Sequence, residues 1–233
     1  MAELTQPATV LSVTDLTPNV RQLVILPKEQ KLAYQPGQWV SLKLPVGVHP
    51  PLNRAYSLAA PASPSGEMTL VFDRVPDGMG SGYLYQAKPG DELFLSGPHG
   101  AFTLPQPNGK ELLLIGRYTG LVPLRCMLKA LYAHRDRSPI LLIAIGPAEG
   151  ELLYHEEFLS LAMTHPSFRY LPLVATDDEA AVALTVGMLR PLIDGKPHVL
   201  PLLCGRKGFV RPLRAYFMEA GYDRKEVKTE TYD

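Results

Sequence analysis

The tetrapeptide at 54–57 combines three side chains that suit one large, anionic and aromatic ligand. It reads Arg54-Ala55-Tyr56-Ser57. A guanidinium can pair with a phosphate, a phenol ring can stack on a flat heterocycle, and a hydroxyl can hydrogen-bond a ring nitrogen. Four residues are a weak motif, however, and an edge strand with a surface arginine is the simpler explanation of them taken alone.

A glycine-rich segment lies further along the chain, directly before a stretch that is expected to be helical. Its central residues are Gly78, Met79, Gly80 and Ser81. Glycines and a serine at a helix start expose backbone N–H groups, which can cradle a pyrophosphate. The alternative is a flexible hairpin loop that holds no ligand.

A third group of candidate residues lies near the end of the chain. Cys204 and Gly205 end an apolar run, and Arg206 and Lys207 follow at the expected start of a helix. Two cations beside a helix N-terminus attract an anion, although a solvated basic helix start is an equal alternative. Cys204 itself, on an apolar strand, is more typical of a core residue than of a reactive thiol.

The composition argues against several classes of protein. Lys and Arg together number 23, as do Asp and Glu, and zero net charge argues against a broad grip on nucleic acid or an anionic membrane. Two cysteines are too few for an iron–sulfur cluster, and the six histidines form no metal-binding pattern, so no metal is expected. No apolar run reaches about 18 residues and no signal-peptide pattern occurs, which predicts no membrane span and a cytoplasmic location.

The two parts of the chain have different hydrophobic patterns. Short apolar runs separated by Pro and Gly predict strands in the first part, and they favour an antiparallel barrel or sandwich. From residue 111 onward, buried-strand runs such as ELLLI alternate with stretches of helical period. We therefore expect a Greek-key β-barrel domain at 1–105 and an α/β domain with a parallel sheet at 106–233, joined by a Pro/Gly/Asn loop.

The order and spacing of these segments resemble those of the ferredoxin–NADP reductase-like oxidoreductases over essentially the whole chain. In length the chain is most similar to the small stand-alone flavin reductases of that superfamily. The segments that carry the resemblance are PGQW (36–39), RAYS (54–57), FDRVPDGMGS (72–81), PGDELFLSGPHGAF (89–102), TGLVP (119–123), LLYHEEF (152–158), HPSFRYLPLV (165–174) and CGRKGFVRPLR (204–214).

The resemblance implies an FAD cofactor and gives roles to the residues of the first domain. Arg54 is expected to contact the flavin's phosphate and Ser57 the region of its reactive ring nitrogen, with Ala55 and Tyr56 beside them. The segment from Gly78 to Ser81 is expected to bind the pyrophosphate. Phe72 and Arg74 are expected alongside the flavin.

The resemblance also implies a nicotinamide dinucleotide site in the second domain. Cys204 is expected by the nicotinamide, with Gly205, Arg206 and Lys207 after it. Tyr232 is a candidate for the C-terminal aromatic residue that relatives place over or near the flavin, although a terminal tyrosine without a role is as simple an explanation.

The loop after the first parallel strand departs from the family pattern GGTGxxP. Thr119, Gly120 and Pro123 fit the pattern, but Arg117 and Tyr118 replace two glycines. Side chains at these two positions can obstruct a pyrophosphate, or Arg117 can pair with it.

The sequence leaves the choice between NADH and NADPH open. Glu149 follows the second parallel strand where an arginine is often found, and a carboxylate there would repel a 2′-phosphate. Arg206 and Lys207 point the other way, toward NADPH.

The function predicted from the sequence is that of an NAD(P)H-dependent flavin oxidoreductase. Hydride would pass from the nicotinamide to FAD, and electrons would leave to a separate acceptor, namely free flavin, an iron–sulfur protein or a haem protein. A second hypothesis keeps the flavin but replaces the nicotinamide with a protein electron donor. A third is a binding module that has lost both ligands. The oligomeric state is left open.

Overall fold

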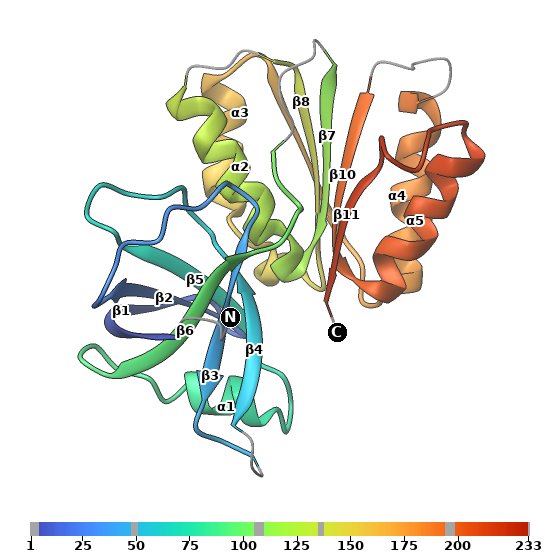
Figure 1. The fold of residues 1–233 in the computed structure, drawn as a ribbon. Helices are drawn as coiled ribbons and strands as arrows, with labels where there is room; N and C mark the ends of the chain where they lie inside the picture. The colour runs from blue at the N-terminus through green and yellow to red at the C-terminus, as the bar shows by residue number, and fades with distance from the viewer. Residues whose placement is uncertain (1–4, 48–50, 105–109, 135–137, 194–198, 233) are drawn as a thin grey trace. The chain divides into compact units, whose positions relative to one another are not determined.

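The computed structural model describes residues 5–47, 51–104, 110–134, 138–193 and 199–232 (Figure 1). The chain divides into two compact units, Met1–Leu104 with Arg125–Ala133, and Pro105–Leu124 with His134–Asp233. The first unit contains an antiparallel sheet and the second a parallel sheet with helices, so the predicted fold class is confirmed. The boundary at 105/106 falls at a segment outside the described residues and stays a prediction.

The antiparallel sheet of the first unit is a Greek-key barrel. Its strands are β1 (Gln6–Thr17), β2 (Val20–Pro27), β3 (Trp39–Leu44), β4 (Leu52–Ser57), β5 (Met68–Asp73) and β6 (Glu92–His99), and a short helix α1 (Met79–Leu84) follows β5. The strand order is β4-β3-β6-β1-β2-β5. A bridge between Leu58 and Leu70 joins the two ends of the sheet, which closes the barrel there.

Alternating side chains fill the inside of the barrel, as the period of a strand requires. On β3, Val40, Leu42 and Leu44 are fully buried, whereas Lys43 between two of them is exposed. The exposed residues of β3 therefore alternate with the buried ones along the strand.

The turn before β3 depends on a glycine. Gly37 has a φ of 101°, and a Cβ atom on it would lie 2.0 Å from the Phe102 carbonyl oxygen and 2.4 Å from the Met127 side chain. Any side chain at position 37 would therefore combine backbone strain with a clash against backbone, which explains the Pro-Gly sequence at 36–37.

The sheet of the second unit is parallel throughout. Its strands are β7 (Glu111–Arg117), β8 (Ile140–Gly146), β9 (Phe168–Val174), β10 (Val199–Arg206) and β11 (Lys228–Tyr232), in the order β11-β10-β7-β8-β9. Its helices are α3 (His155–Thr164), α4 (Asp178–Ile193) and α5 (Lys207–Glu219), and it contains the first four residues of α2 (Leu121–Ala133), whose remaining residues belong to the first unit. Figure 1 shows α4 and α5 together on one face of the sheet and α3 on the other. No helix in the described ranges is long and apolar enough to cross a membrane.

The strand order of this sheet reverses at β7. The chain runs outward from β7 through β8 to β9, and then returns to place β10 on the other side of β7. Open α/β sheets bind ligands beyond the carboxyl ends of the strands at such a reversal. The carboxyl ends of β7 and β10 are therefore the expected ligand position of this unit.

We expect Gly37→Ala to lower the free energy of unfolding by roughly 2–5 kcal/mol, because strain and overlap add. Gly90→Ala is the matched control, since Gly90 has a φ of 95° but a Cβ atom added there would have no neighbour within 4 Å. In the control, backbone strain alone should lower the free energy of unfolding by only about 1–2 kcal/mol. Urea unfolding measures both, and equal losses would contradict the close approach at position 37.

Candidate functional site

The segment at 54–57 lies on β4, a strand at one end of the sheet order. β4 pairs along one side with β3, where Trp39 lies opposite Ser57. Arg54 and Ala55 are exposed, and Ser57 is half-buried. The Arg54 guanidinium donates to the carbonyl of Asn53 at 2.9 Å, which leaves most of its five N–H groups for other acceptors.

Aromatic rings support Tyr56 from behind. The Phe72 ring contacts Tyr56 edge-on at 5.8 Å between centroids and Tyr85 at 5.5 Å, and Phe72 is buried in the barrel core. The Arg74 guanidinium lies 5.3 Å from the centre of the Tyr85 ring. Burial raises the pKa of Tyr56 to about 12, so its hydroxyl stays protonated. Phe72 therefore positions Tyr56, and a direct contact of Phe72 or Arg74 with flavin stays a prediction.

The glycine-rich segment forms the first turn of a helix, whereas the sequence placed it before one. α1 begins at Met79, and Ser81 is buried within it. The Ser81 hydroxyl accepts a hydrogen bond from the Val75 N–H at 3.2 Å and lies 3.2 Å from the Gly78 carbonyl. Ser81 thus closes the loop onto itself, and its predicted contact with a pyrophosphate stays a prediction.

The two motifs of the first unit meet at Gly80. A Cβ atom at position 80 would lie 3.5 Å from the Arg54 Cγ and 3.3 Å from methyl groups of Leu44 and Leu52. Gly80 therefore lies within van der Waals contact distance of the stem of Arg54. On β4, Arg54 is an exposed cation and Tyr56 is a half-buried phenol ring, and the glycine-lined loop at Gly80 lies beside them. This arrangement fits an anionic, aromatic cofactor such as FAD.

A second glycine defines the ligand position of the parallel sheet. A Cβ atom on Gly120 would lie 2.3 Å from the Cys204 carbonyl oxygen, so the loop after β7 touches the end of β10 only because residue 120 is glycine. Pro123 is buried in the first turn of α2. Cys204 is fully buried, and burial raises the pKa of its thiol well above the ordinary value. Burial therefore disfavours the thiolate form of Cys204, and its expected place by the nicotinamide stays a prediction.

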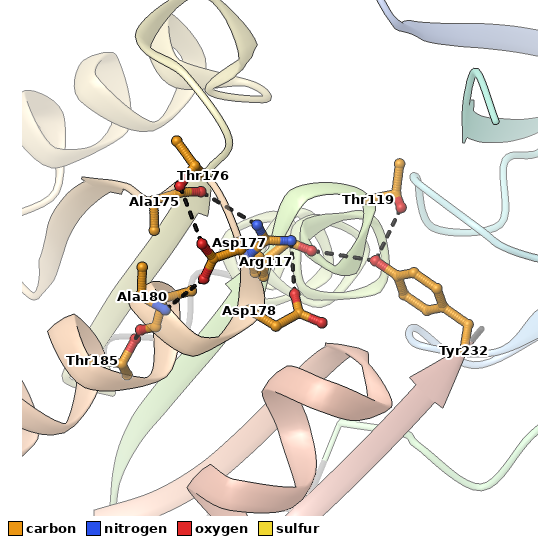
Figure 2. A network of polar contacts seen from close by, with 10 residues as sticks. Arg117, Thr119, Ala175, Thr176, Asp177, Asp178, Ala180, Thr185 and Tyr232 are labelled. Carbon is orange, nitrogen blue, oxygen red and sulfur yellow. Dashed lines mark hydrogen bonds and ion pairs between the residues drawn. The ribbon is translucent and has the colours of Figure 1, made fainter. Parts of the chain in front are cut away.

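Arg117 and Tyr118, the two residues that depart from the expected family pattern, both bond to neighbouring segments. The Arg117 guanidinium pairs with Asp178 at 2.9 Å and donates to the Ala175 carbonyl at 3.3 Å (Figure 2). The Tyr118 hydroxyl donates to a Glu151 carboxylate oxygen at 3.2 Å. Arg117 is thus occupied by protein partners, and its predicted pairing with a pyrophosphate stays a prediction.

Tyr118 has a left-handed backbone, with a φ of 54°. Glycine adopts this conformation freely, whereas a residue with a side chain is strained by about 1–2 kcal/mol. The loop therefore keeps a glycine-like path although it carries a tyrosine.

Tyr232 lies at the carboxyl end of the sheet, opposite Arg206 in the ladder of β11 and β10. Its hydroxyl accepts a hydrogen bond from Thr119 at 3.0 Å and donates to the Arg117 carbonyl at 3.3 Å. The structure therefore brings the C-terminal aromatic residue and the loop after β7 together at the ligand position.

Gly205, Arg206 and Lys207 join β10 to α5. Arg206 is exposed, Lys207 is half-buried, and the first turn of α5 contains no acidic residue. The two cations thus stand at the positive end of the helix dipole, where an anion is favoured.

Glu230 is a candidate that the sequence did not reveal. It lies opposite Cys204 in the ladder of β11 and β10, two residues before Tyr232. Burial raises the pKa of its carboxyl to about 7, and its Oε2 has no hydrogen-bond partner. The Glu230 carboxyl therefore changes its protonation state near neutral pH. Its place opposite Cys204 depends on the pairing of β11 with β10, which the polar residues of this strand do not indicate in the sequence.

No group of three or more His, Cys, Asp or Glu residues suited to a metal ion occurs within the ranges that the structure describes.

Known proteins share both units. Residues 7–104 match the oxidoreductase FAD-binding domain family, and residues 114–214 match the oxidoreductase NAD-binding domain family. The chain is 30% identical to ferredoxin–NADP reductase B of Sorangium cellulosum, over 97% of this chain and 97% of that protein. It is 34% identical to the reductase component of phenol 2-monooxygenase from Pseudomonas sp. strain CF600, over 72% of this chain and 48% of that protein.

Solved structures show the same fold. The ferredoxin–NADP reductase of Plasmodium falciparum has a TM-score of 0.86 at 18% identity, over 100% of this chain and 98% of that chain. The Amycolatopsis reductase GcoB has a TM-score of 0.84 at 26% identity, over 99% of this chain and 71% of that chain.

The chain belongs to the ferredoxin–NADP reductase-like family of flavin oxidoreductases. The predicted family and the predicted cofactors, FAD with a nicotinamide dinucleotide, are confirmed. The chain spans about half the length of several reductase components that it matches, such as 48% of the phenol 2-monooxygenase component. The roles of the individual site residues stay predictions.

We expect Glu230→Gln to stabilise the protein at pH 8 and to have little effect at pH 5. The folded state holds the Glu230 proton up to about pH 7, whereas an unfolded chain releases it near its ordinary pKa of 4.5. The wild type therefore loses stability as the pH rises from 4.5 to 7, by an amount on the order of 1–3 kcal/mol.

Urea unfolding at the two pH values measures this difference. Glu226→Gln is the control with the opposite sign, because hydrogen bonds from the Asp223 N–H and Lys110 hold the pKa of Glu226 below its ordinary value. This control should lose stability at pH 8. An equal response of the two variants would rule out the burial of Glu230.

Proposed function

We propose that this protein is an NADH-preferring flavin reductase that binds FAD and passes electrons to a separate protein. Bound FAD and the nicotinamide donor supply the hydride-transfer chemistry. The side chains bind and orient these groups, and no acid–base pair of the protein is required. The observation that carries the proposal is the meeting of Arg54 with the glycine-lined loop at Gly80.

The first unit is assigned to FAD. Arg54 pairs with a phosphate, Tyr56 stacks on a flat ring, and the Ser57 hydroxyl hydrogen-bonds a ring nitrogen. Phe72 and Tyr85 fix the Tyr56 ring, which reduces the entropy that binding has to remove.

The preference for NADH is supported by the charges around the parallel sheet. The exposed carboxylates Glu149, Asp177 and Glu179 follow β8 and β9, and the Arg117 cation on this side is already neutralised by Asp178. These carboxylates accept a ribose hydroxyl and repel a 2′-phosphate. We assign Arg206 and Lys207 to the pyrophosphate, which removes the conflict that the sequence left open.

The acceptor is proposed to be a separate redox protein. Relatives include the reductase components of phenol 2-monooxygenase and of an aromatic O-demethylase, which carry further sequence beyond the part matched here. The chain has two cysteines, and both are buried, so they cannot hold an iron–sulfur cluster. A cytoplasmic location, predicted from the sequence, stays a proposal.

A second candidate function is that of an FAD subunit reduced by a protein partner. The observation in its favour is that Arg117 and Tyr118 occupy the loop where relatives carry glycines. Their side chains reduce the space for a dinucleotide.

An anaerobic titration separates the two candidates. We expect NADH to bleach the flavin of the FAD-loaded protein at least about tenfold more efficiently than NADPH, equivalent to about 1.4 kcal/mol of discrimination. The visible absorbance of the flavin is followed in a stopped-flow instrument. Flavin that binds but stays oxidised with both donors would favour the subunit reduced by a protein, and faster bleaching by NADPH would reverse the proposed donor preference.

We expect Arg54→Gln to weaken FAD binding about 10- to 100-fold, because a charge-assisted hydrogen bond contributes roughly 1.5–3 kcal/mol. Lys43→Gln is the matched control, since Lys43 is an exposed cation on the neighbouring strand, in register with Asn53. Calorimetric titration of the apoprotein with FAD gives both affinities. Equal losses in the two variants would show a general effect of surface charge.

A further inference from the structure

The last residue of β7 and the two residues after it each bond to a different segment of the second unit. Arg117 bonds to the start of α4, Tyr118 to the loop after β8, and Thr119 to the end of β11 (Figure 2 shows the first and third). The loop in which relatives place small residues is therefore cross-linked in this chain by side chains.

The pair of Arg117 and Asp178 is enclosed. The side chain of Arg117 is 8% exposed and that of Asp178 is 27% exposed, and their charged atoms lie 2.9 Å apart. A Cβ atom at Gly208, in the first turn of α5, would lie 2.7 Å from a carboxylate oxygen of Asp178. The lack of a side chain at position 208 leaves room for this carboxylate, and the carboxylate is the only charged partner of the buried guanidinium among the described residues.

Asp178 is not needed to cap α4. The N-terminal cap is Asp177, whose carboxylate accepts the Ala180 N–H at 2.8 Å. The two neighbouring aspartates therefore have separate roles, one toward the helix and one toward Arg117.

Tyr232 depends on the same loop for its position. It ends a five-residue strand that pairs only with β10, and its hydroxyl lies between the Thr119 hydroxyl and the Arg117 carbonyl. A shift of the backbone at 117–119 therefore moves both partners of the Tyr232 hydroxyl at once.

We propose that Asp178, acting through Arg117, is a positioning residue for Tyr232 at the ligand position of the parallel sheet. Without Asp178, the Arg117 guanidinium would be buried without its counter-charge, and it would have to move toward water together with its backbone. The consequence for the donor rests on the proposed function: a fixed Tyr232 lowers the entropy lost when the nicotinamide half of NADH binds.

Hydrogen exchange tests the coupling without any donor. We expect Asp178→Asn to accelerate exchange of the amides of residues 229–232 about fivefold or more, since one lost hydrogen bond corresponds to about 1 kcal/mol. Asp177→Asn is the matched control, because it removes an equal charge one residue away and asparagine still caps the helix. Unchanged exchange at 229–232 in Asp178→Asn, or equal acceleration in both variants, would overturn the proposal.

Thr119→Val gives a second test that leaves the ion pair intact. It should accelerate exchange at 229–232 by itself and add nothing further in the Asp178→Asn background, because both changes release the same tyrosine. Additive effects would show that Asp178 and Thr119 act independently and would overturn the proposal. If Asp178→Asn fails to fold, unchanged exchange in Thr119→Val alone decides against it.

Kinetics of the FAD-loaded protein test the functional consequence. We expect Asp178→Asn and Thr119→Val to raise the KM for NADH about 3- to 10-fold with kcat within about twofold of wild type, as for lost preorganisation. Calorimetric binding of 5′-AMP, which lacks the nicotinamide half, should be unchanged. An equal weakening of 5′-AMP binding would overturn the assignment of the KM effect to Tyr232. A wild type that NADH does not reduce would refute the proposed function, while the exchange measurements would still decide the coupling.

Discussion

The contact between the loop after β7 and the end of β10 is the constraint on which the second unit depends. Gly120 and the Cys204 carbonyl approach so closely that no other residue fits at position 120. This contact lies where the strand order reverses, which is where a dinucleotide is expected to bind. Thr119 and Tyr232 are held directly beside it, and their arrangement follows from that one approach of backbone to backbone.

Charge at the carboxyl end of the sheet is distributed in a way that single motifs do not show. The Arg117 cation is paired within the protein with Asp178, and Arg206 and Lys207 lie at the N-terminal end of α5. An arginine in a dinucleotide loop is thus no proof of a phosphate contact. In the first unit, by contrast, the Arg54 side chain is exposed and lies beside the glycine-lined loop.

The sequence predicted the barrel and the parallel sheet because apolar periods are local and strong there. It did not predict β11, since the residues of KTETY are polar and their strand exists only through pairing with β10. The raised pKa of Glu230 followed from that missing strand and could not be foreseen without it. Likewise, the sequence named Arg54 and Gly80 separately, but their proximity depends on the closed barrel.

The polar β11 also protects the sheet from self-association. If it were removed, β10 would become the outermost strand, with an almost entirely buried apolar run and a row of unpaired backbone groups. Such an edge recruits strands from other molecules, and β11 covers it in this chain. A deletion of residues 228–232 would therefore remove Tyr232 and leave the apolar β10 as the edge of the sheet.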